Sequence, residues 1–244
     1  MGRITEAIKH LIIINIIFFA VPQMIQGLDI AQYLALYFPK NENFGLWQYV
    51  SHMFMHGSFM HIAFNMYALW AFGTPLEQMW GRNKFLFFYF SAGLGAGIIY
   101  TLVNYYQFNG IYEHFINAGL NNKEIISILE MGQTNDIRVV NNITQEQFNK
   151  ITSLYNTPAV GASGAVYGIL VAFGMTFPNA KLALIFFPVP IAAKYFIPVM
   201  ILGDLFFGVT KYSIGNVAHF AHIGGALIGF IIAWYWKKNQ FRTY

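Results

Sequence analysis

The hydrophobic positions of this chain form long apolar runs separated by short polar segments. A helix needs about 20 mainly apolar residues to cross the hydrocarbon of a bilayer. The runs therefore predict six membrane-spanning helices, at about residues 10–28, 52–73, 85–106, 158–177, 194–210 and 217–236. We expect an all-α polytopic membrane protein in which these helices form one bundle and one domain over residues 1–244.

Two segments interrupt this pattern. Residues 178–193 contain FFPVP, whose prolines disfavour a helix, and they predict a loop that lies along the membrane. Residues 107–157 form a polar insertion without an apolar stretch long enough to span. The first apolar run lacks a small-residue cleavage site, so we expect a retained helix and not a cleaved signal peptide.

Composition supports a membrane protein and excludes several kinds of site. The chain is 57% hydrophobic and 10% charged, whereas an ordinary soluble domain is roughly 25% charged. The absence of cysteine excludes disulfides and thiolate metal sites. The net charge of +4 comes without a dense basic run, so we expect the lipid bilayer as a partner and no nucleic acid.

The distribution of lysine and arginine predicts the orientation, because these residues are enriched on the cytoplasmic side. Nine would lie on the side of both termini: Arg3, Lys9, Arg82, Lys84, Lys181, Lys194, Lys237, Lys238 and Arg242. Five would lie opposite: Lys40, Lys123, Arg138, Lys150 and Lys211. We expect cytoplasmic termini, with the 29–50 segment and the 107–157 insertion outside.

This topology places two reactive side chains at one depth. Ser163 and His222 each lie about five residues into a predicted helix that enters from the outer side. At 1.5 Å per residue, both would sit about 8 Å below that face. A nucleophile and its base need such proximity. His61 and Asn65 would come from the same side, somewhat deeper.

Small residues surround Ser163 and allow a second interpretation. Three glycines fall on one face of its predicted helix: Gly161, Gly164 and Gly168. This face could be only a packing seam, with the Ser163 hydroxyl bonded to its own backbone. Gly225 and Gly229 follow His222 and would bring the two helices close together.

His222 is an ionisable residue inside an apolar helix, a placement that usually marks function. The structural alternative is a neutral histidine bonded to a backbone carbonyl. Tyr167, one turn below Ser163, could pack on the imidazole and hold its orientation. His219 lies nearer the surface and is a candidate accessory.

The 52–73 segment carries three histidines, and HMFMH would place His52 and His56 on one helix face, where they could bind zinc. His61 would lie about 140° around that helix from His56, and no H-E-x-x-H motif is present. We therefore expect no metal and favour structural hydrogen bonds. His61 and Asn65 share a face and could donate to an oxyanion.

In this order, the segments HMFMHGSFMHIAFN, FGTPLEQMWG, GASGAVYG and AHFAHIGGALIG resemble the rhomboid family of intramembrane serine proteases, over residues 45–236. The resemblance implies a rhomboid-like bundle and a dyad of Ser163 and His222 with no third carboxylate and no cofactor. It also implies an oxyanion site made by the Ser163 backbone N–H, His61 and Asn65. The supporting residues would be Tyr167, Gly161 and Gly164.

Three other positions match or depart from the family. Glu77 falls in a helix–helix turn, where its role would be structural. Asp204 falls near the gate of the family's substrate path, and we do not assign it as a triad acid. Gln48 follows Trp47 where the family often has arginine, so the resemblance does not predict how the 29–50 segment is anchored.

The resemblance implies a serine endopeptidase that cleaves transmembrane segments of other membrane proteins through an acyl-enzyme. Substrates would carry a helix-destabilised segment and enter beside the 194–210 helix. We expect a bacterial cytoplasmic membrane, with the active site opening to its outer face. One alternative is a non-catalytic rhomboid-like protein that binds membrane spans. A histidine-lined metal transporter is disfavoured, because only Asp204 and Glu77 supply carboxylates in or near the spans.

Overall fold

The computed structural model describes residues 3–25, 29–184, 187–210 and 218–239. Its long helices are α1 (Glu6–Met24), α4 (Phe59–Ala68), α6 (Arg82–Asn117), α10 (Ser163–Thr176), α11 (Ala193–Val209) and α12 (His219–Asn239). Shorter elements are α2 (Ala31–Leu34), α3 (Gln48–Ser51), the 3₁₀ turn η1 (His52–Phe54), the π-helical turn η2 (Leu69–Gly73) and α5 (Thr74–Trp80). The insertion contains α7 (Asn122–Met131), α8 (Ile137–Asn142) and α9 (Gln145–Asn156).

The fold is a helical membrane bundle, as the apolar pattern predicts. Among the described residues, three helices are long and apolar enough to cross a bilayer: α1, α6 and α12. Helix α10 is apolar but shorter. Large apolar side chains remain exposed along α1, α11 and α12, including Ile17, Val199 and Ile231. Lipid contact accounts for such a surface, which a soluble protein would bury.

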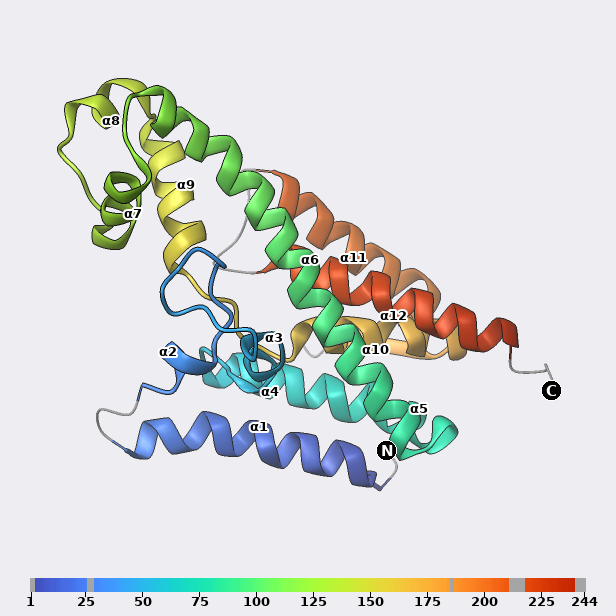
Figure 1. Ribbon diagram of the computed structural model, residues 1–244. Coiled ribbons are helices and arrows are strands. Elements are labelled where there is room, and N and C mark those ends of the chain that lie inside the picture. Colours follow the sequence, from blue (N-terminus) through green and yellow to red (C-terminus); the bar gives the residue numbers. More distant parts are fainter. Residues whose placement is uncertain (1–2, 26–28, 185–186, 211–217, 240–244) are drawn as a thin grey trace.

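Helix α10 is the buried centre of the bundle, packed against α6 and α12 (Figure 1). A Cβ atom added at Gly225 would lie 1.9 Å from the carbonyl oxygen of Gly164, and one at Gly229 would lie 2.5 Å from Cα of Gly168. The two backbones therefore touch, which confirms the close approach predicted from their glycines. Gly161 precedes α10 and does not belong to this face.

The second predicted span has different bounds. It begins at Phe59 and not at 52, because Ser58 caps α4: its Oγ accepts a hydrogen bond from the His61 N–H at 3.2 Å. The helix then continues through η2 and α5 to Trp80. The prediction of one helix face for His52 and His56 is wrong, because η1 ends at Phe54 and His56 lies in the loop before α4.

Glu77 joins α5 to the start of α1. Its Oε1 accepts the Ala7 N–H at 2.8 Å, its Oε2 accepts the Ile8 N–H at 3.1 Å, and the Thr5 hydroxyl also donates to it. These are N–H groups of the first helical turn, which have no partner within a helix. The carboxylate is buried and caps α1, a structural role.

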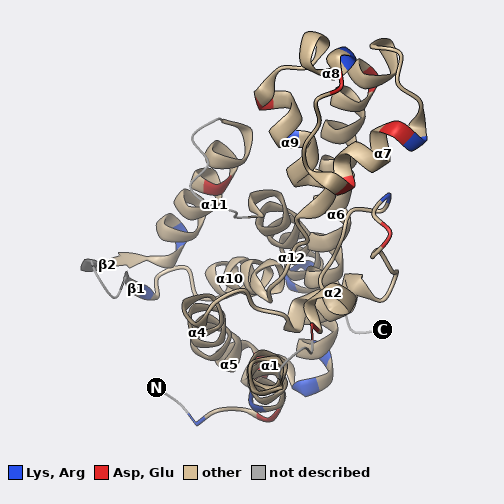
Figure 2. Ribbon diagram, turned by 90° about the vertical axis from the view of Figure 1, so that its left-hand side faces the viewer, with Lys and Arg blue, Asp and Glu red and all other residues tan. Residues whose placement is uncertain are grey.

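The 107–157 insertion is helical. Helix α6 ends at Asn117, beyond the predicted 106, and α7, α8 and α9 gather at that end of the molecule (Figure 1). They enclose a separate apolar core that includes Phe108, Phe115, Ile125 and Ile151. Several positions on these helices are charged residues, coloured blue and red on the ribbon (Figure 2). The insertion, predicted only as a polar segment that does not span the membrane, is thus a small helical subdomain.

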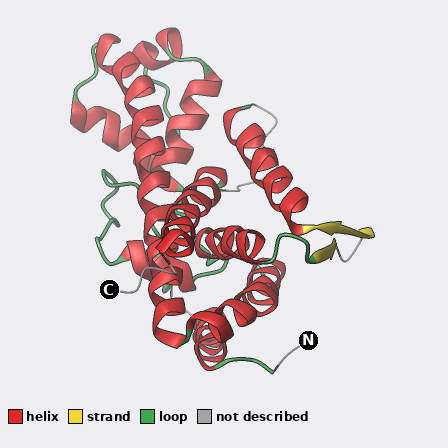
Figure 3. Ribbon diagram, turned by 90° about the vertical axis from the view of Figure 1, so that its right-hand side faces the viewer, coloured by secondary structure: helices red, strands yellow, loops and turns green. Residues whose placement is uncertain are grey.

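The 178–193 segment is also more regular than predicted. It forms an antiparallel hairpin of β1 (Lys181–Leu184) and β2 (Phe187–Ala192), in which Lys181 pairs with Ala192 (Figure 3). Pro188 and Pro190 lie in β2. A two-stranded hairpin leaves one edge of each strand without a partner, and proline is tolerated there.

Both ends of the bundle can be recognised. Helix α1 begins, and α12 ends, at the end of the molecule opposite the insertion (Figure 1). There the Lys84 ammonium lies 4.3 Å from the Trp236 ring, and the rings of Trp80 and Trp236 lie 5.1 Å apart. Tryptophan and lysine are typical of a membrane–water interface. The orientation also rested on Lys211 and Arg242, which lie outside the described residues, as does the predicted start of the last helix at 217.

Candidate active site

The candidate site lies where the N-terminal ends of α4, α10 and α12 meet. Ser163 is the first residue of α10, and not about five residues into it as predicted. His222 lies in the first turn of α12, and His61 in the first turn of α4. The first N–H groups of a helix have no intrahelical partner and carry partial positive charge. Three such ends therefore converge near one hydroxyl.

Ser163 and His222 form a hydrogen-bonded pair. The Nε2 atom of His222 lies 2.9 Å from the Ser163 Oγ. The Tyr167 ring stacks on the His222 imidazole, with centroids 4.2 Å apart and an angle of 11° between the planes. The stack prevents the imidazole from turning away from the serine. Both partners are only partly buried.

The expectation that His222 has no carboxylate partner is wrong. The Oδ1 atom of Asp204, on α11, lies 3.2 Å from the His222 Nδ1. It also lies 2.6 Å from the His219 Nδ1, while the Tyr167 hydroxyl donates to Oδ2. The signal for this network was present in the sequence, because Asp204 is a charged residue in an apolar helix.

His61 and Gly161 lie beside the serine. A Cβ atom at Gly161 would lie 2.7 Å from the His61 Nε2 and 3.7 Å from the Ser163 Oγ. Gly161 also has φ of 121°, in the left-handed region that disfavours side chains. Its N–H donates to the His52 carbonyl at 2.9 Å. Only glycine satisfies these conditions, and it lets the imidazole approach Ser163.

Asn65 is placed differently. It is 6% exposed, and its Nδ2 donates to the His61 carbonyl at 2.9 Å within the same helix. Its amide is therefore directed along α4, one turn deeper than His61. The structure brings together Ser163, His222 and His61, with Asn65 behind them.

The other two histidines of the segment, His52 and His56, lie beside the site. The buried His52 hydrogen-bonds through Nδ1 to the Gln48 carbonyl at 2.7 Å. The His56 ring lies 5.0 Å from the His61 ring, at an angle of 68°. The predicted angle of about 140° between His56 and His61 around one helix is thus wrong, because His56 lies in the loop before α4.

Gln48 anchors the 29–50 segment, which the resemblance left unexplained. Its side chain is fully buried. Its Nε2 donates to the Asn43 carbonyl at 2.7 Å and to the Tyr33 carbonyl at 3.2 Å, and its Oε1 accepts the Tyr37 N–H at 3.1 Å. The amide thus supplies the loop contacts for which an arginine was expected.

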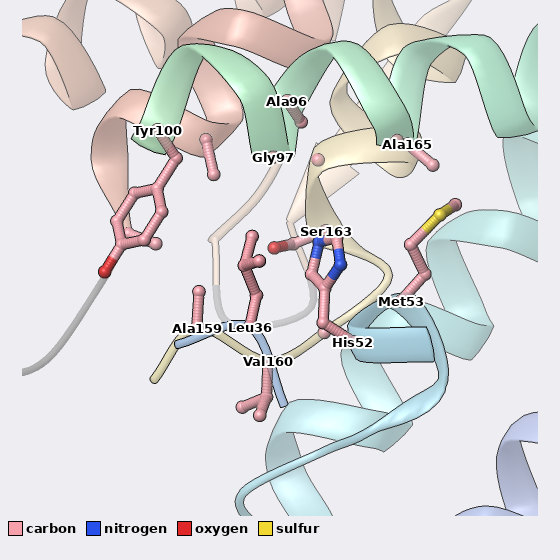
Figure 4. Close-up of a pocket in the computed structure, with 15 residues that line it drawn as sticks. Leu36, His52, Met53, Ala96, Gly97, Tyr100, Ala159, Val160, Ser163 and Ala165 are labelled. Atoms are coloured by element: carbon pink, nitrogen blue, oxygen red, sulfur yellow. The ribbon is translucent and has the colours of Figure 1, made fainter. Parts of the chain in front are cut away.

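A small cavity lies behind the serine, between α6 and α10. It is lined by His52, Gly97, Tyr100 and Ser163 among others (Figure 4). Its volume of about 10 Å³ is near the lower limit for one water molecule. Leu36 and Ala159 close its edge with paired backbone hydrogen bonds of 2.9 and 2.8 Å. The cavity is too small for a substrate, which must reach Ser163 from another side.

Comparison with known proteins gives one consistent result. The model of the Rhomboid domain matches residues 43–115 and 137–239. The chain is 28% identical over 187 residues to Rhomboid protein 1, mitochondrial, of Saccharomyces cerevisiae, covering 76% of this chain and 40% of that protein.

Two further relatives agree with this match. The chain is 29% identical over 204 residues to the presenilin-associated rhomboid-like protein, mitochondrial, of Rattus norvegicus, covering 77% of this chain and 38% of that protein. It is 26% identical over 200 residues to the rhomboid protease AarA of Providencia stuartii, covering 77% of this chain and 54% of that protein. The chain therefore spans only part of the length of these relatives.

Proposed function

This chain belongs to the rhomboid family, and we propose that it is a serine endopeptidase that cleaves transmembrane segments of other membrane proteins. The observation that carries the proposal is the distance of 2.9 Å between the His222 Nε2 and the Ser163 Oγ. A serine hydroxyl is a weak nucleophile until a neighbouring base accepts its proton. Both groups sit in a helical membrane bundle, so their substrate is a membrane span.

The reaction is acyl transfer in two stages. The Ser163 oxygen attacks the scissile carbonyl as its proton passes to the His222 Nε2, and this proton then goes to the leaving amine. Water, activated by the same imidazole, hydrolyses the acyl-enzyme. No cofactor takes part in these steps.

The developing oxyanion is held by three donors. The Ser163 N–H lies at a helix start, where it has no intrahelical partner. The His61 imidazole lies beside Ser163, because Gly161 between them has no side chain that would separate the two. Asn65 contributes through the second N–H of its Nδ2, because the first donates to the His61 carbonyl. Asn65 lies one turn deeper than His61, so His61 has the larger share. Donors already in place at the oxyanion lower the barrier because little reorganisation is needed.

Substrates are membrane spans with a helix-destabilised segment. A helix hides its backbone carbonyls in i to i−4 hydrogen bonds, so a peptide must unwind locally before Ser163 can attack it. Entry is beside α11 and the 29–50 segment. Helix α11 exposes apolar side chains such as Val199, Leu202 and Phe206, which suit contact with another span.

The protein is an integral membrane protein, and we propose six spans with both termini on one side. The start of α1 and the end of α12 lie at the same end of the molecule, which supports this topology (Figure 1). The site then opens to the opposite face, which also carries the insertion. Named relatives include mitochondrial proteins and a Providencia protease, so the expectation of a bacterial cytoplasmic membrane is not supported by the comparisons.

Active-site labelling tests the proposal. The protein in detergent is treated with a fluorophosphonate probe, beside Ser163→Ala and His222→Ala. We expect covalent labelling of the wild type at Ser163 and none of either variant. Equal labelling of all three, or of none, contradicts the proposal. A non-catalytic family member that only binds membrane spans would show no labelling in any of the three proteins.

A further inference from the structure

Asp204 is a buried carboxylate on a helix that is otherwise largely exposed to lipid. Its exposure is 8%, while its neighbours Leu205 and Phe206 are 42% and 52% exposed. A charge removed from water is costly unless hydrogen bonds compensate it. Three donors from two other helices do so: the rings of His219 and His222 and the hydroxyl of Tyr167.

The carboxylate determines which nitrogen of His222 carries the proton. An ionised carboxylate only accepts hydrogen bonds, so a ring nitrogen 3.2 Å from it must donate. The His222 Nδ1 therefore holds the proton, and the Nε2 that faces Ser163 is left with a free lone pair. This is the tautomer that a general base requires.

From this geometry we propose that Asp204 is the positioning residue of the site, which fixes the tautomer and orientation of His222. The inference rests on the proposed function. Asp204 does not take up a proton in the reaction. As the Ser163 O–H bond breaks and the Nε2–H bond forms, the carboxylate stays ionised and stabilises the imidazolium through Nδ1–H.

Tyr167 and His219 hold the carboxylate in place. Tyr167 both stacks on the imidazole and donates to Asp204 Oδ2, so one side chain fixes two members of the site. His219 lies 2.6 Å from Oδ1, the oxygen that also faces His222. The carboxylate thus has a single orientation, set by α10 and α12, although it belongs to α11.

The same atoms could instead bind a divalent cation. One ligand atom each from Asp204, His219 and His222 lie within 4.8 Å of one another, and a carboxylate with two imidazoles suits zinc. A metal on Nδ1 of His222 would leave the proton on Nε2, where it faces Ser163. The serine would then have no base, so the hydrogen-bonded arrangement is the one compatible with catalysis.

The test removes the negative charge and keeps the shape. Asp204→Asn is compared with the wild type for kcat and KM on a single-span substrate, and for the rate of fluorophosphonate labelling. We expect kcat and the labelling rate to fall by about 10²–10⁴-fold, as when a triad carboxylate becomes an amide, with KM within about twofold. Ile17→Ala, which truncates an exposed side chain of α1, a helix that contributes no residue to the site, should alter neither by more than about twofold.

Three results would overturn the proposal. The first is an Asp204→Asn variant whose kcat and labelling rate stay within about threefold of the wild type. The second is an equal loss in Ile17→Ala, which would assign the effect to the stability of the bundle as a whole. The third is activity that is abolished by EDTA and restored by zinc.

A measurement on the wild type keeps the test valid if Asp204→Asn does not fold. Nitrogen-15 NMR of labelled histidine, assigned by comparison with His222→Gln, reports the tautomer of the resting enzyme. We expect the proton on Nδ1, and a proton on Nε2 contradicts the positioning role. This readout needs no turnover, so it separates failure of the inference from failure of the proposed protease function.

Discussion

At the residue scale, the surroundings of Ser163 allow little substitution. Gly161 has φ of 121° and would bring a Cβ atom 2.7 Å from the His61 Nε2. The same residue ties the loop before α10 to the His52 carbonyl. A side chain there would displace the imidazole that we propose as oxyanion donor, so the position serves geometry and chemistry together.

Removing the His61 imidazole should slow the chemical step. We expect His61→Ala to lower kcat by about 10²–10³-fold, the usual loss for one oxyanion donor. Asn65→Ala should lose less, because Asn65 lies one turn deeper than His61 and only one of its two amide N–H groups is free of the His61 carbonyl. The measurement is kcat on a single-span substrate, with thermal unfolding as the control for folding. An Asn65→Ala loss larger than that of His61→Ala would reverse the assignment.

The sequence suffices for some of these residues and not for others. Ser163 and His222 follow from span counting and charge bias, which place two reactive residues near one face. Asp204 does not, because its contact with His222 depends on the rotation of α11 about its axis, which apolar periodicity does not specify. The family resemblance also argued against a third carboxylate. An ionisable residue in an apolar helix was the stronger signal.

At the element scale, the contact between α10 and α12 holds the dyad together. Gly164 and Gly225 meet backbone to backbone, close to Ser163 and His222 in the chain. Small residues permit such close approach of helices in membranes. The glycine pattern predicted this contact correctly, since it depends only on residue size at helical spacing.

A methyl group in this contact should destabilise the bundle. In Gly225→Ala, the new Cβ would lie 1.9 Å from the Gly164 carbonyl oxygen, so the helices must separate, at a cost of about 1–3 kcal/mol or more. Thermal unfolding in detergent should shift to lower temperature, and labelling of Ser163 should slow. Gly110→Ala on α6 is the matched control, because nothing lies within 4 Å of its Cβ position. Unfolding at the wild-type temperature for Gly225→Ala would contradict the packing account.

Helix ends were harder to predict than helix existence. Hydropathy marks apolar runs, whereas capping residues determine where a helix begins. Ser58 caps α4, and residues 121 and 144 begin capping boxes for α7 and α9. These local signals were present in the sequence, and they explain why the insertion is helical although it lacks a long apolar run.

Acid should loosen the insertion through one charged network. The Asn121 N–H and the Arg138 guanidinium lower the pKa of Glu124, and Arg138 lowers the pKa of Asp136. When folding lowers the pKa of a carboxyl group, its ionised form stabilises the folded state. This contribution is fully present above the pKa of the unfolded chain, 4.5 for Glu124, and is lost as the pH falls below it. Hydrogen-exchange protection of α7 should therefore decrease below about pH 4.5.

Glu124→Gln is the control for this effect. It should lower the protection of α7 near neutral pH and reduce its dependence on acid. The exposed position of the network means that high salt should weaken the wild-type effect. The same acid dependence in the variant and the wild type would show that Glu124 does not contribute.

At the scale of the whole molecule, two packed regions divide the chain. The bundle around α10 carries the site, and the helical insertion encloses its own core at the end opposite to the start of α1 (Figure 1). Span counting predicted the first region in outline. It could not predict the second, because a core made by short amphipathic helices depends on tertiary contacts.

Single cysteines can test the orientation, since the chain has none of its own. Lys123→Cys, in the insertion, should react with a membrane-impermeant maleimide in intact cells of the expression host. Lys238→Cys, at the end of α12, should react only after the cells are permeabilised. Both side chains are exposed, so accessibility depends on the membrane. The reverse pattern, or reaction of both in intact cells, would contradict the topology.

Cleavage of a membrane span by Ser163 is the central claim, and reconstitution tests it most directly. The wild type and Ser163→Ala are placed in liposomes with a substrate that has one span containing a helix-destabilised segment, and the products are identified by mass spectrometry. We predict a cut within the span by the wild type and no cut by Ser163→Ala. Undiminished cleavage by the variant, cutting only outside the span, or no cleavage by the wild type would contradict the account.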